Sequence, residues 1–206
     1  MEYPDTPRAF AQRRIVELRR LMLSEPHVAP LTAYVEELRA KHPKWEFQDF
    51  DPLDGGIDAD ILFLLEKPGP MTSPTGKRQG SGFISRDNDD PTAEALFKFM
   101  QQAGIDRKRT VLWNVVPGWD GTRKLNSVQV RDGVTELANL MVLLPRVKTV
   151  VLVGGKAARA EKFMASMNLR IFRSAHPSPL VYARYPEIWR DIWNRWAEAG
   201  RTIPKL

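Results

Sequence analysis

Residues 61–65 read Ile-Leu-Phe-Leu-Leu, an unbroken apolar run as long as one β-strand. A strand that is apolar on both faces is typical of a parallel sheet covered by helices on both sides. Residues 110–113 and 149–153 have a similar character, and a fourth strand is predicted at about 169–172. These segments predict a short central parallel sheet of about four strands.

A helical segment follows each predicted strand. One helix should begin near Asp90 and end at Gly104, a second should cover about 127–144, a short one should follow Gly154-Gly155, and the last should begin at Pro186. Strands and helices that alternate in this order fold with right-handed connections into a layered parallel structure. The sequence therefore predicts an α/β protein, a three-layer α/β/α sandwich.

The first 58 residues follow a different pattern. Residues 6–22 and 31–38 carry apolar side chains at helical spacing, whereas 43–58 are rich in Pro, Gly and Asp. A chain of 206 residues is compatible with one domain. We interpret residues 1–206 as a single domain, with 1–58 as a helical N-terminal extension packed on it.

The composition excludes several kinds of site. Because the chain has no cysteine, it has no disulfide framework, thiolate zinc site, iron–sulfur cluster or cysteine nucleophile. Its three histidines, His27, His42 and His176, are far apart in the sequence. We therefore expect no metal and no organic cofactor. No apolar run approaches the roughly 20 residues of a membrane span, and we expect a cytoplasmic monomer without a membrane partner.

Positive charge is concentrated in the second half of the chain. Residues 101–206 contain 18 Lys and Arg against 8 Asp and Glu, and the whole chain has a formal net charge of +6. A basic surface attracts polyanions, because each cation that neutralises a phosphate releases counterions. On charge alone, however, an ordinary solvated surface is the better interpretation.

Four polar or proline-containing segments follow the predicted strands. They read Glu-Lys-Pro-Gly-Pro at 66–70, Asn-Val-Val-Pro-Gly-Trp at 114–119, Gly-Gly-Lys at 154–156 and Ser-Ala-His-Pro-Ser-Pro-Leu at 174–180. Ligands of open α/β sheets bind outside the carboxyl ends of the strands. The four segments should therefore line one crevice, where an Asn offers a donor beside an acceptor and a His can stabilise a developing oxyanion.

The order of these motifs resembles that of the uracil-DNA glycosylase superfamily over roughly residues 58–185. His-Pro-Ser-Pro-Leu at 176–180 is similar to the same segment of the family's best-known branch, and Asn114 matches the Asn that recognises uracil. Residues 65–69 are similar to the first motif, which reads Gly-Gln-Asp-Pro-Tyr or Gly-Glu-Ala-Pro-Gly in different branches. Gly82-Phe83 lies where the family places an aromatic residue. Four pieces in the family's order make the resemblance specific.

The resemblance implies a DNA repair enzyme that rotates uracil out of DNA, hydrolyses its N-glycosidic bond and leaves an abasic site. Uracil-containing DNA, single- or double-stranded, would be its partner. Phe83 would stack on the base, Asn114 would bind its edge, and His176 with backbone N–H groups near Glu66 and Lys67 would stabilise the departing base. The implied DNA contacts are the apolar wedge Leu180, Ser178, and the cations Lys156, Arg173 and Arg184.

The chain departs from the family within the first motif. Lys67 stands where the best-known branch has its water-orienting Asp, and Gly69 replaces the Tyr that excludes the methyl group of thymine. A lysine cannot orient water as a carboxylate does, so Glu66 is our preferred substitute. The alternatives for this role are Asp87, Asn88 and Asp89. The Gly-Glu-Ala-Pro-Gly branch is closer, but its cluster-binding cysteines are absent, so we interpret the chain as a divergent, metal-free member.

Three other functions stay open. Lys67 in place of the Asp is compatible with a protein that binds uracil or abasic DNA without turnover. An enzyme of the same fold could act on another damaged or mismatched base, such as thymine or a deaminated purine. A nucleotide hydrolase with a carboxylate–metal centre would lose activity in chelator, and we predict no such loss.

Overall fold

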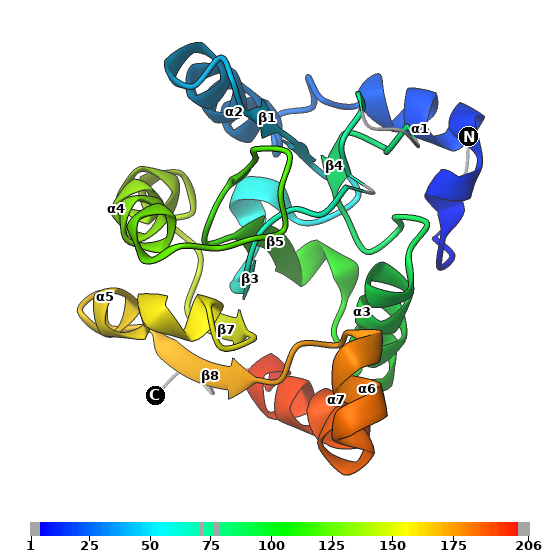
Figure 1. Cartoon of the computed structure of the whole chain (residues 1–206), viewed down its shortest axis with the longest axis vertical. Coiled ribbons are helices and arrows are strands. Elements are labelled where there is room, and N and C mark those ends of the chain that lie inside the picture. The colour runs from blue at the N-terminus through cyan, green and yellow to red at the C-terminus, as the bar shows by residue number, and fades with distance from the viewer. Residues whose placement is uncertain (1–4, 71, 76–78, 202–206) are drawn as a thin grey trace.

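The computed structural model of the protein describes residues 5–70, 72–75 and 79–201. Its centre is a four-stranded sheet with the strand order β5-β3-β7-β8, in which every neighbouring pair is parallel (Figure 1). The strands are β3 (Ile61–Leu65), β5 (Thr110–Asn114), β7 (Thr149–Val153) and β8 (Arg170–Ser174). The predicted sheet is confirmed, and its last strand ends two residues later than expected.

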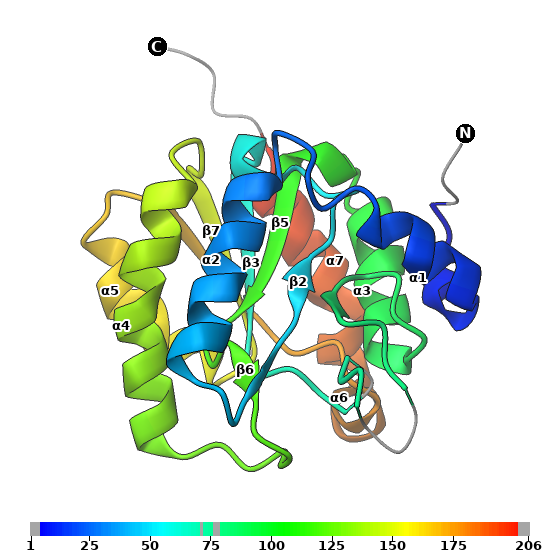
Figure 2. The ribbon, with the colours of Figure 1, turned by 90° about the horizontal axis from the view of Figure 1, so that it is seen from above.

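Helices cover both faces of the sheet, which confirms the three-layer α/β/α sandwich (Figures 1 and 2). Seven α-helices are described: α1 (Arg13–Arg20), α2 (Ala29–Lys41), α3 (Pro91–Gln102), α4 (Ser127–Leu143), α5 (Glu161–Ala165), α6 (Pro179–Arg184) and α7 (Pro186–Gly200). Helices α2 and α4 lie on one face, and α3 and α7 lie on the other (Figure 2). Short 3-10 helices cover Ala9–Ala11, Gly56–Asp58, Arg107–Arg109 and Ala157–Ala160.

Burial explains why the strands read as continuous apolar runs. Every residue of β3, β5 and β7 is buried, whereas the edge strand β8 is only partly buried. The ring of Phe63 on β3 meets the fully buried Trp196 of α7 in an edge-to-face contact with centroids 5.0 Å apart. Each large apolar side chain buried in this way stabilises the fold by roughly 1.5–3 kcal/mol.

Two pairs of very short strands lie outside the central sheet. Strand β1 (Glu46–Phe47) pairs with β6 (Gly118–Trp119), and β2 (Asp49–Phe50) pairs with β4 (Phe83–Ile84). The sequence predicts only irregular chain in these places, because two-residue strands are too short to show a periodicity. They tie the segment before β3 to the two long loops that follow β3 and β5.

Two apolar clusters join the N-terminal part to the rest of the chain. Leu31 and Val35 of α2 belong to the same apolar cluster as the central strands. A second, smaller cluster joins Phe10 and Val16 to Phe83 in the loop after β3. The predicted extension covers 1–58, of which residues 1–4 lie outside the described residues. No helix within the described ranges is long and apolar enough to cross a membrane.

Candidate active site

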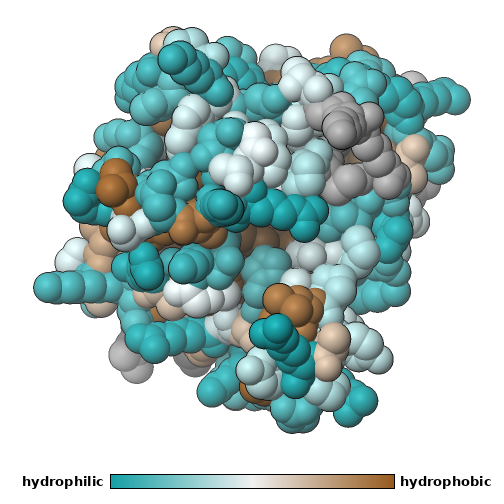
Figure 3. Space-filling view, in the orientation of Figure 1, coloured by the Kyte–Doolittle hydropathy of each residue, from teal (hydrophilic) through white to brown (hydrophobic). Residues whose placement is uncertain are grey.

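A cleft of about 950 Å³ opens at the carboxyl edge of the central sheet. Segments that follow all four strands line it, together with the N-terminal turn of α3 and residues of α6 and α7. This edge faces the viewer in Figure 3, where apolar side chains are visible in the recess near the middle of the face. The four segments singled out in the sequence therefore meet in one place, as parallel strands require.

The sheet register fixes Asn114 beside Glu66. Asn114, the last residue of β5, pairs with Leu65 at the end of β3. Beyond the strands, the N–H of Val115 donates to the carbonyl of Leu65 at 2.8 Å, and the N–H of Val116 donates to that of Glu66 at 3.0 Å. Asn114 is 4% exposed and lines the cleft. Its amide is thus held at the floor by a rigid strand rather than by a mobile loop.

The carboxylate of Glu66 lies over the turn that follows β7. Its Oε1 accepts a hydrogen bond from the backbone N–H of Lys156 at 2.9 Å, whereas Oε2 accepts none from the described residues. Gly154 makes this approach possible, because a Cβ at that position would lie 2.6 Å from Oε1. Gly154 also has a φ of +94°, which L side chains rarely adopt. One carboxylate oxygen is therefore fixed and the other is available to a ligand in the cleft.

His176 completes this group of cleft residues. It follows β8, is half-buried and lines the cleft. Burial lowers the pKa of His176 below 6.5, although the negative charges of Glu66 and Asp90 partly offset the effect. The lowered pKa favours the neutral imidazole, which has one N–H to donate. Pro177 and Pro179, which follow His176 in the chain, restrict the conformations of the backbone next to it.

Lys67 lines the cleft, but its ammonium group is paired within the protein. Its Nζ donates to Oδ1 of Asp120 at 2.6 Å and to the carbonyl of Lys124 at 3.2 Å, and its side chain is only 3% exposed. The rings of Trp45 and Trp119 lie 5.7 and 5.9 Å from the ammonium nitrogen. The ammonium group is thus engaged within the protein and is not free to bind a base.

Phe83 departs from its expected place. The glycine-rich stretch before it suggested an exposed loop, but Phe83 is fully buried and its ring packs on that of Phe10, with centroids 5.5 Å apart. It belongs to the short strand β4, in which successive side chains point to opposite sides. Its neighbour Ile84 lines the cleft instead. The expected stacking of Phe83 on a base does not fit this arrangement.

Asp87, one of the alternatives for orienting water, is buried away from the cleft. Its two carboxylate oxygens accept hydrogen bonds from Arg19 at 3.0 Å and from Arg107 at 2.9 Å. Arg19 also binds Asp51, and Asp51 in turn accepts from the hydroxyl of Ser85, a residue of the cleft wall. These groups form a buried ionic network between the N-terminal segment and the loop after β3.

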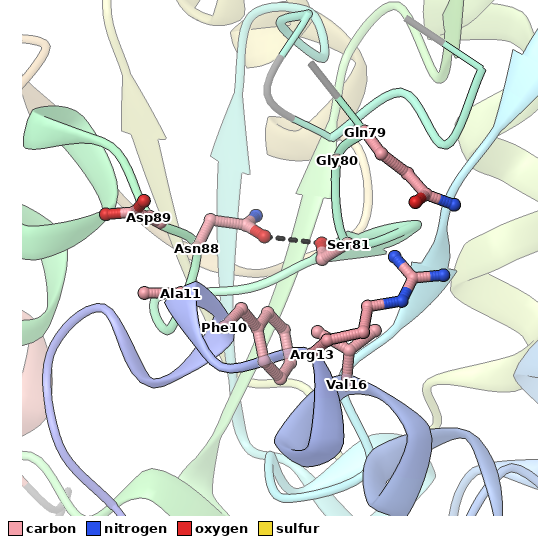
Figure 4. A pocket seen from close by; sticks show the side chains of 9 residues that line it. All are labelled: Phe10, Ala11, Arg13, Val16, Gln79, Gly80, Ser81, Asn88 and Asp89. Carbon is pink, nitrogen blue, oxygen red and sulfur yellow. Dashed lines mark hydrogen bonds between the residues drawn. The ribbon is translucent and has the colours of Figure 1, made fainter.

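The other two alternatives flank a second, smaller cavity of about 140 Å³ (Figure 4). Asn88 lines both this cavity and the cleft, and its amide binds the Ser81 hydroxyl and the carbonyl of Phe83. Asp89 lines only the smaller cavity, pairs with Arg8 at 3.4 Å and points away from the other labelled side chains in Figure 4. Of the three alternatives, only Asn88 reaches the cleft.

The expected DNA contacts divide into two groups. Leu180 is 61% exposed at the rim of the cleft, and Ser178 lines the cleft while its Oγ caps helix α6 by accepting from the N–H of Val181 at 3.4 Å. The remaining three expected contacts, Lys156, Arg173 and Arg184, do not line the cleft. Arg173 pairs with Glu161 on the neighbouring helix at 2.9 Å.

Several cleft residues were not anticipated from the sequence as site residues. Asp90 caps α3, with its Oδ1 accepting from the N–H groups of Thr92 and Ala93, and an Asp-Pro pair at a helix start was the available signal. Ile84, Arg123 and Tyr185 are further examples. No periodicity or motif marks them, because their position depends on tertiary packing.

No group of three or more His, Cys, Asp or Glu suited to a metal ion occurs among residues 5–70, 72–75 and 79–201. None of the curated protein sequences matches the chain. The family model of the uracil DNA glycosylase superfamily matches residues 52–197, more than half of the chain. The match covers the central sheet and every strand-end segment of the cleft. By fold and by sequence, the chain belongs to the uracil-DNA glycosylase superfamily, and its function is of the DNA glycosylase type.

Proposed function

We propose that this protein removes uracil from DNA by hydrolysing the bond between the base and the deoxyribose. The observation that carries the proposal is the convergence of Asn114, Glu66 and His176 on one cleft at the carboxyl edge of the sheet. Membership of the superfamily supports the same type of reaction. Neither the sequence motifs alone nor the fold alone would favour this function as strongly.

Each of the three side chains has a role that its chemistry supports. The amide of Asn114 offers a donor and an acceptor to the edge of a pyrimidine. As the bond between C1′ and N1 breaks, its electron pair passes to the base, and a neutral His176 donates a hydrogen bond to the oxygen on which charge develops. The free oxygen of Glu66 orients a water molecule, whose oxygen bonds to C1′ while its proton is released through the carboxylate.

A second candidate substrate is thymine opposite guanine. The observation that favours it is the open space at Gly69, where a Cβ would meet no atom within 4 Å. Nothing attached to that position excludes the 5-methyl group of thymine. The wall of the cleft is apolar in part, with Ile84 and Leu112 among its residues, and an apolar pocket discriminates only weakly between substrates that differ by one methyl group.

The test uses end-labelled oligonucleotides that contain one uracil, as single strands, opposite guanine and opposite adenine. Matched substrates carry thymine opposite guanine or hypoxanthine. Excision is scored as strand breakage after alkali, with enzyme in excess. Strand breakage at uracil supports the proposal. Breakage only at thymine or hypoxanthine would make that base the substrate instead. Tight binding of the uracil strand without breakage would indicate a binding protein without catalytic activity. Activity that disappears in chelator would instead favour the metal-dependent hydrolase.

A further inference from the structure

The loop that joins β6 to α4 places a cation at the cleft. Arg123, near the middle of this loop, is exposed and lines the cleft. Its guanidinium makes no hydrogen bond or ion pair with any residue that the structure describes. The other charged groups in the cleft wall are the carboxylates of Glu66 and Asp90 and the ammonium of Lys67, which is already paired with Asp120. Within the described chain, Arg123 is therefore the free cation of the cleft.

This loop is braced on both sides of Arg123. On one side, Oδ1 of Asp120 accepts from Lys67 Nζ at 2.6 Å and from the N–H of Thr122 at 3.1 Å. The other oxygen of Asp120 accepts from the side-chain amide of Gln129 on α4 at 2.7 Å. On the other side, the carbonyl of Lys124 accepts from the same Lys67 ammonium at 3.2 Å. A single lysine thus holds the residues before and after Arg123.

The surroundings of Lys67 make this brace strong. The ammonium lies near the faces of Trp45 and Trp119, and the backbones carrying these rings are tied together through the pairing of β1 with β6. With its side chain 3% exposed, Lys67 is shielded from water, and Asp120 is 15% exposed. An ion pair with little access to solvent is weakened less by salt than a surface pair. The brace should therefore persist at the salt concentrations at which DNA binds.

We propose that Arg123 is a phosphate-binding residue for the nucleic-acid strand that enters the cleft, and that Lys67 is the positioning residue that fixes its loop. The proposal rests on the proposed function in one respect, that the strand is DNA. A polyanion that approaches Glu66 and Asp90 is repelled by two carboxylates, and a guanidinium at the same cleft offsets that repulsion. Arginine also matches a phosphate with two parallel hydrogen bonds, and a braced loop loses little entropy on binding.

The first test measures the salt dependence of DNA binding. The probe is a fluorescein-labelled single-stranded oligonucleotide with a tetrahydrofuran abasic analogue, which cannot be excised. Arg123→Gln should weaken binding several-fold at low salt and should lower the slope of log Kd against log salt by about 0.7, the value for one phosphate contact on a single strand. An unchanged slope would overturn the proposal.

The matched control is Arg146→Gln. Arg146 is also exposed and lies just before β7, at the amino edge of the sheet and hence at the opposite end from the cleft. This variant removes the same charge, so a general loss of net charge would lower its slope equally. The proposal expects a wild-type slope for Arg146→Gln, and equal slopes for the two variants would overturn it.

The second test concerns Lys67. Lys67→Met should reproduce the reduced slope of Arg123→Gln, whereas Lys67→Arg, which keeps the ion pair with Asp120, should retain the wild-type slope. Combining Lys67→Met with Arg123→Gln should add nothing to the loss in Arg123→Gln alone, because both changes remove the same contact. A fully additive loss would overturn the positioning role. If the variants show the expected slopes but the wild-type protein excises no base, only the proposed function is refuted. If the wild-type protein excises uracil but Arg123→Gln leaves the slope unchanged, only this inference is refuted.

Discussion

Replacing Gly154 by alanine should disable the site by displacing the carboxylate of Glu66, while the side chains of Asn114 and His176 stay unchanged. The new Cβ would lie 2.6 Å from Oε1, 3.0 Å from Cδ and 3.1 Å from Cγ of Glu66. Ordinary contacts begin near 3.4 Å. The carboxylate must therefore move by about 0.8 Å, and it would weaken or lose its hydrogen bond from the N–H of Lys156.

The magnitude follows from that displacement. A misplacement of about 1 Å in a reacting group costs roughly 100-fold in rate, so kcat for base excision should fall between about 10- and 100-fold. The positive φ of Gly154 adds backbone strain of roughly 1–3 kcal/mol for an alanine. The variant should remain folded, because that strain is smaller than the stability of a typical domain.

Single-turnover excision and thermal unfolding measure the two effects separately. The matched control is Gly155→Ala, since a Cβ on Gly155 would meet no atom within 4 Å. Gly155→Ala should keep the wild-type kcat, although it adds the same methyl group one residue away. A folded Gly154→Ala protein with wild-type kcat would refute the reasoning that the placement of Glu66 limits the reaction.

Further predictions concern the other parts of the site and the buried ionic network. Substituting His176 or Asn114 by alanine should each lower single-turnover excision by roughly 100- to 1000-fold, the loss typical of one positioned hydrogen-bond group, with an unchanged melting temperature. Leu180→Ala should raise KM for double-stranded more than for single-stranded substrate, because only a duplex must be kept open by a wedge. Arg19→Met removes one of the two arginine partners of the buried carboxylates of Asp51 and Asp87 and leaves only Arg107 to both, and urea unfolding should report a loss of roughly 3–5 kcal/mol. Burial raises the pKa of Asp54 from 3.8 to about 6. The folded state therefore binds the extra proton between these values, and wild-type stability should fall relative to Asp54→Asn by about 3 kcal/mol as the pH rises from 4 to 7 in urea unfolding.

The central sheet and the place of the cleft were predictable from the sequence. The apolar run at 61–65 is typical of a strand covered on both faces, because each of its side chains is stabilised by burial. The structure buries all five residues. Since the carboxyl ends of parallel strands share one edge, Asn114 and His176 were expected at the same edge of the sheet, and both line the cleft there. These are consequences of local pattern and topology, and neither depends on details of packing.

The contacts of Lys67 and Phe83 were not predictable in the same way. Lys67 faces Asp120, a residue 53 positions away, and the sequence gives no sign of which carboxylate a lysine will meet. The ring of Phe83 packs on the ring of Phe10 instead of lining the cleft, and Phe10 lies in a segment that precedes the family match. The glycine-rich stretch before Phe83 indicates backbone freedom. It does not predict the face of the two-residue strand from which the Phe83 side chain projects.

The buried ionic network shows the same limit for carboxylates. The sequence does not distinguish Asp87 from Asp89, because both are acidic residues of the same polar loop. Asp87 is buried between Arg19 and Arg107, however, and Asp89 faces a different cavity from the cleft. Among the described residues, the carboxylates that line the cleft are those of Glu66 and Asp90. Glu66 was a predicted site residue, and Asp90 was not. Long-range ion pairs thus separate residues that composition cannot distinguish.

The most direct test of the account is a mass measurement on a single-stranded oligonucleotide with one uracil, incubated with excess wild-type protein or with the Asn114→Ala variant. The account predicts one free uracil per strand and an intact strand whose mass corresponds to an abasic site for the wild type, and at least a 100-fold slower release for the variant, as estimated for one positioned hydrogen-bond group. An uncleaved uracil strand after prolonged incubation with the folded wild-type protein would contradict it.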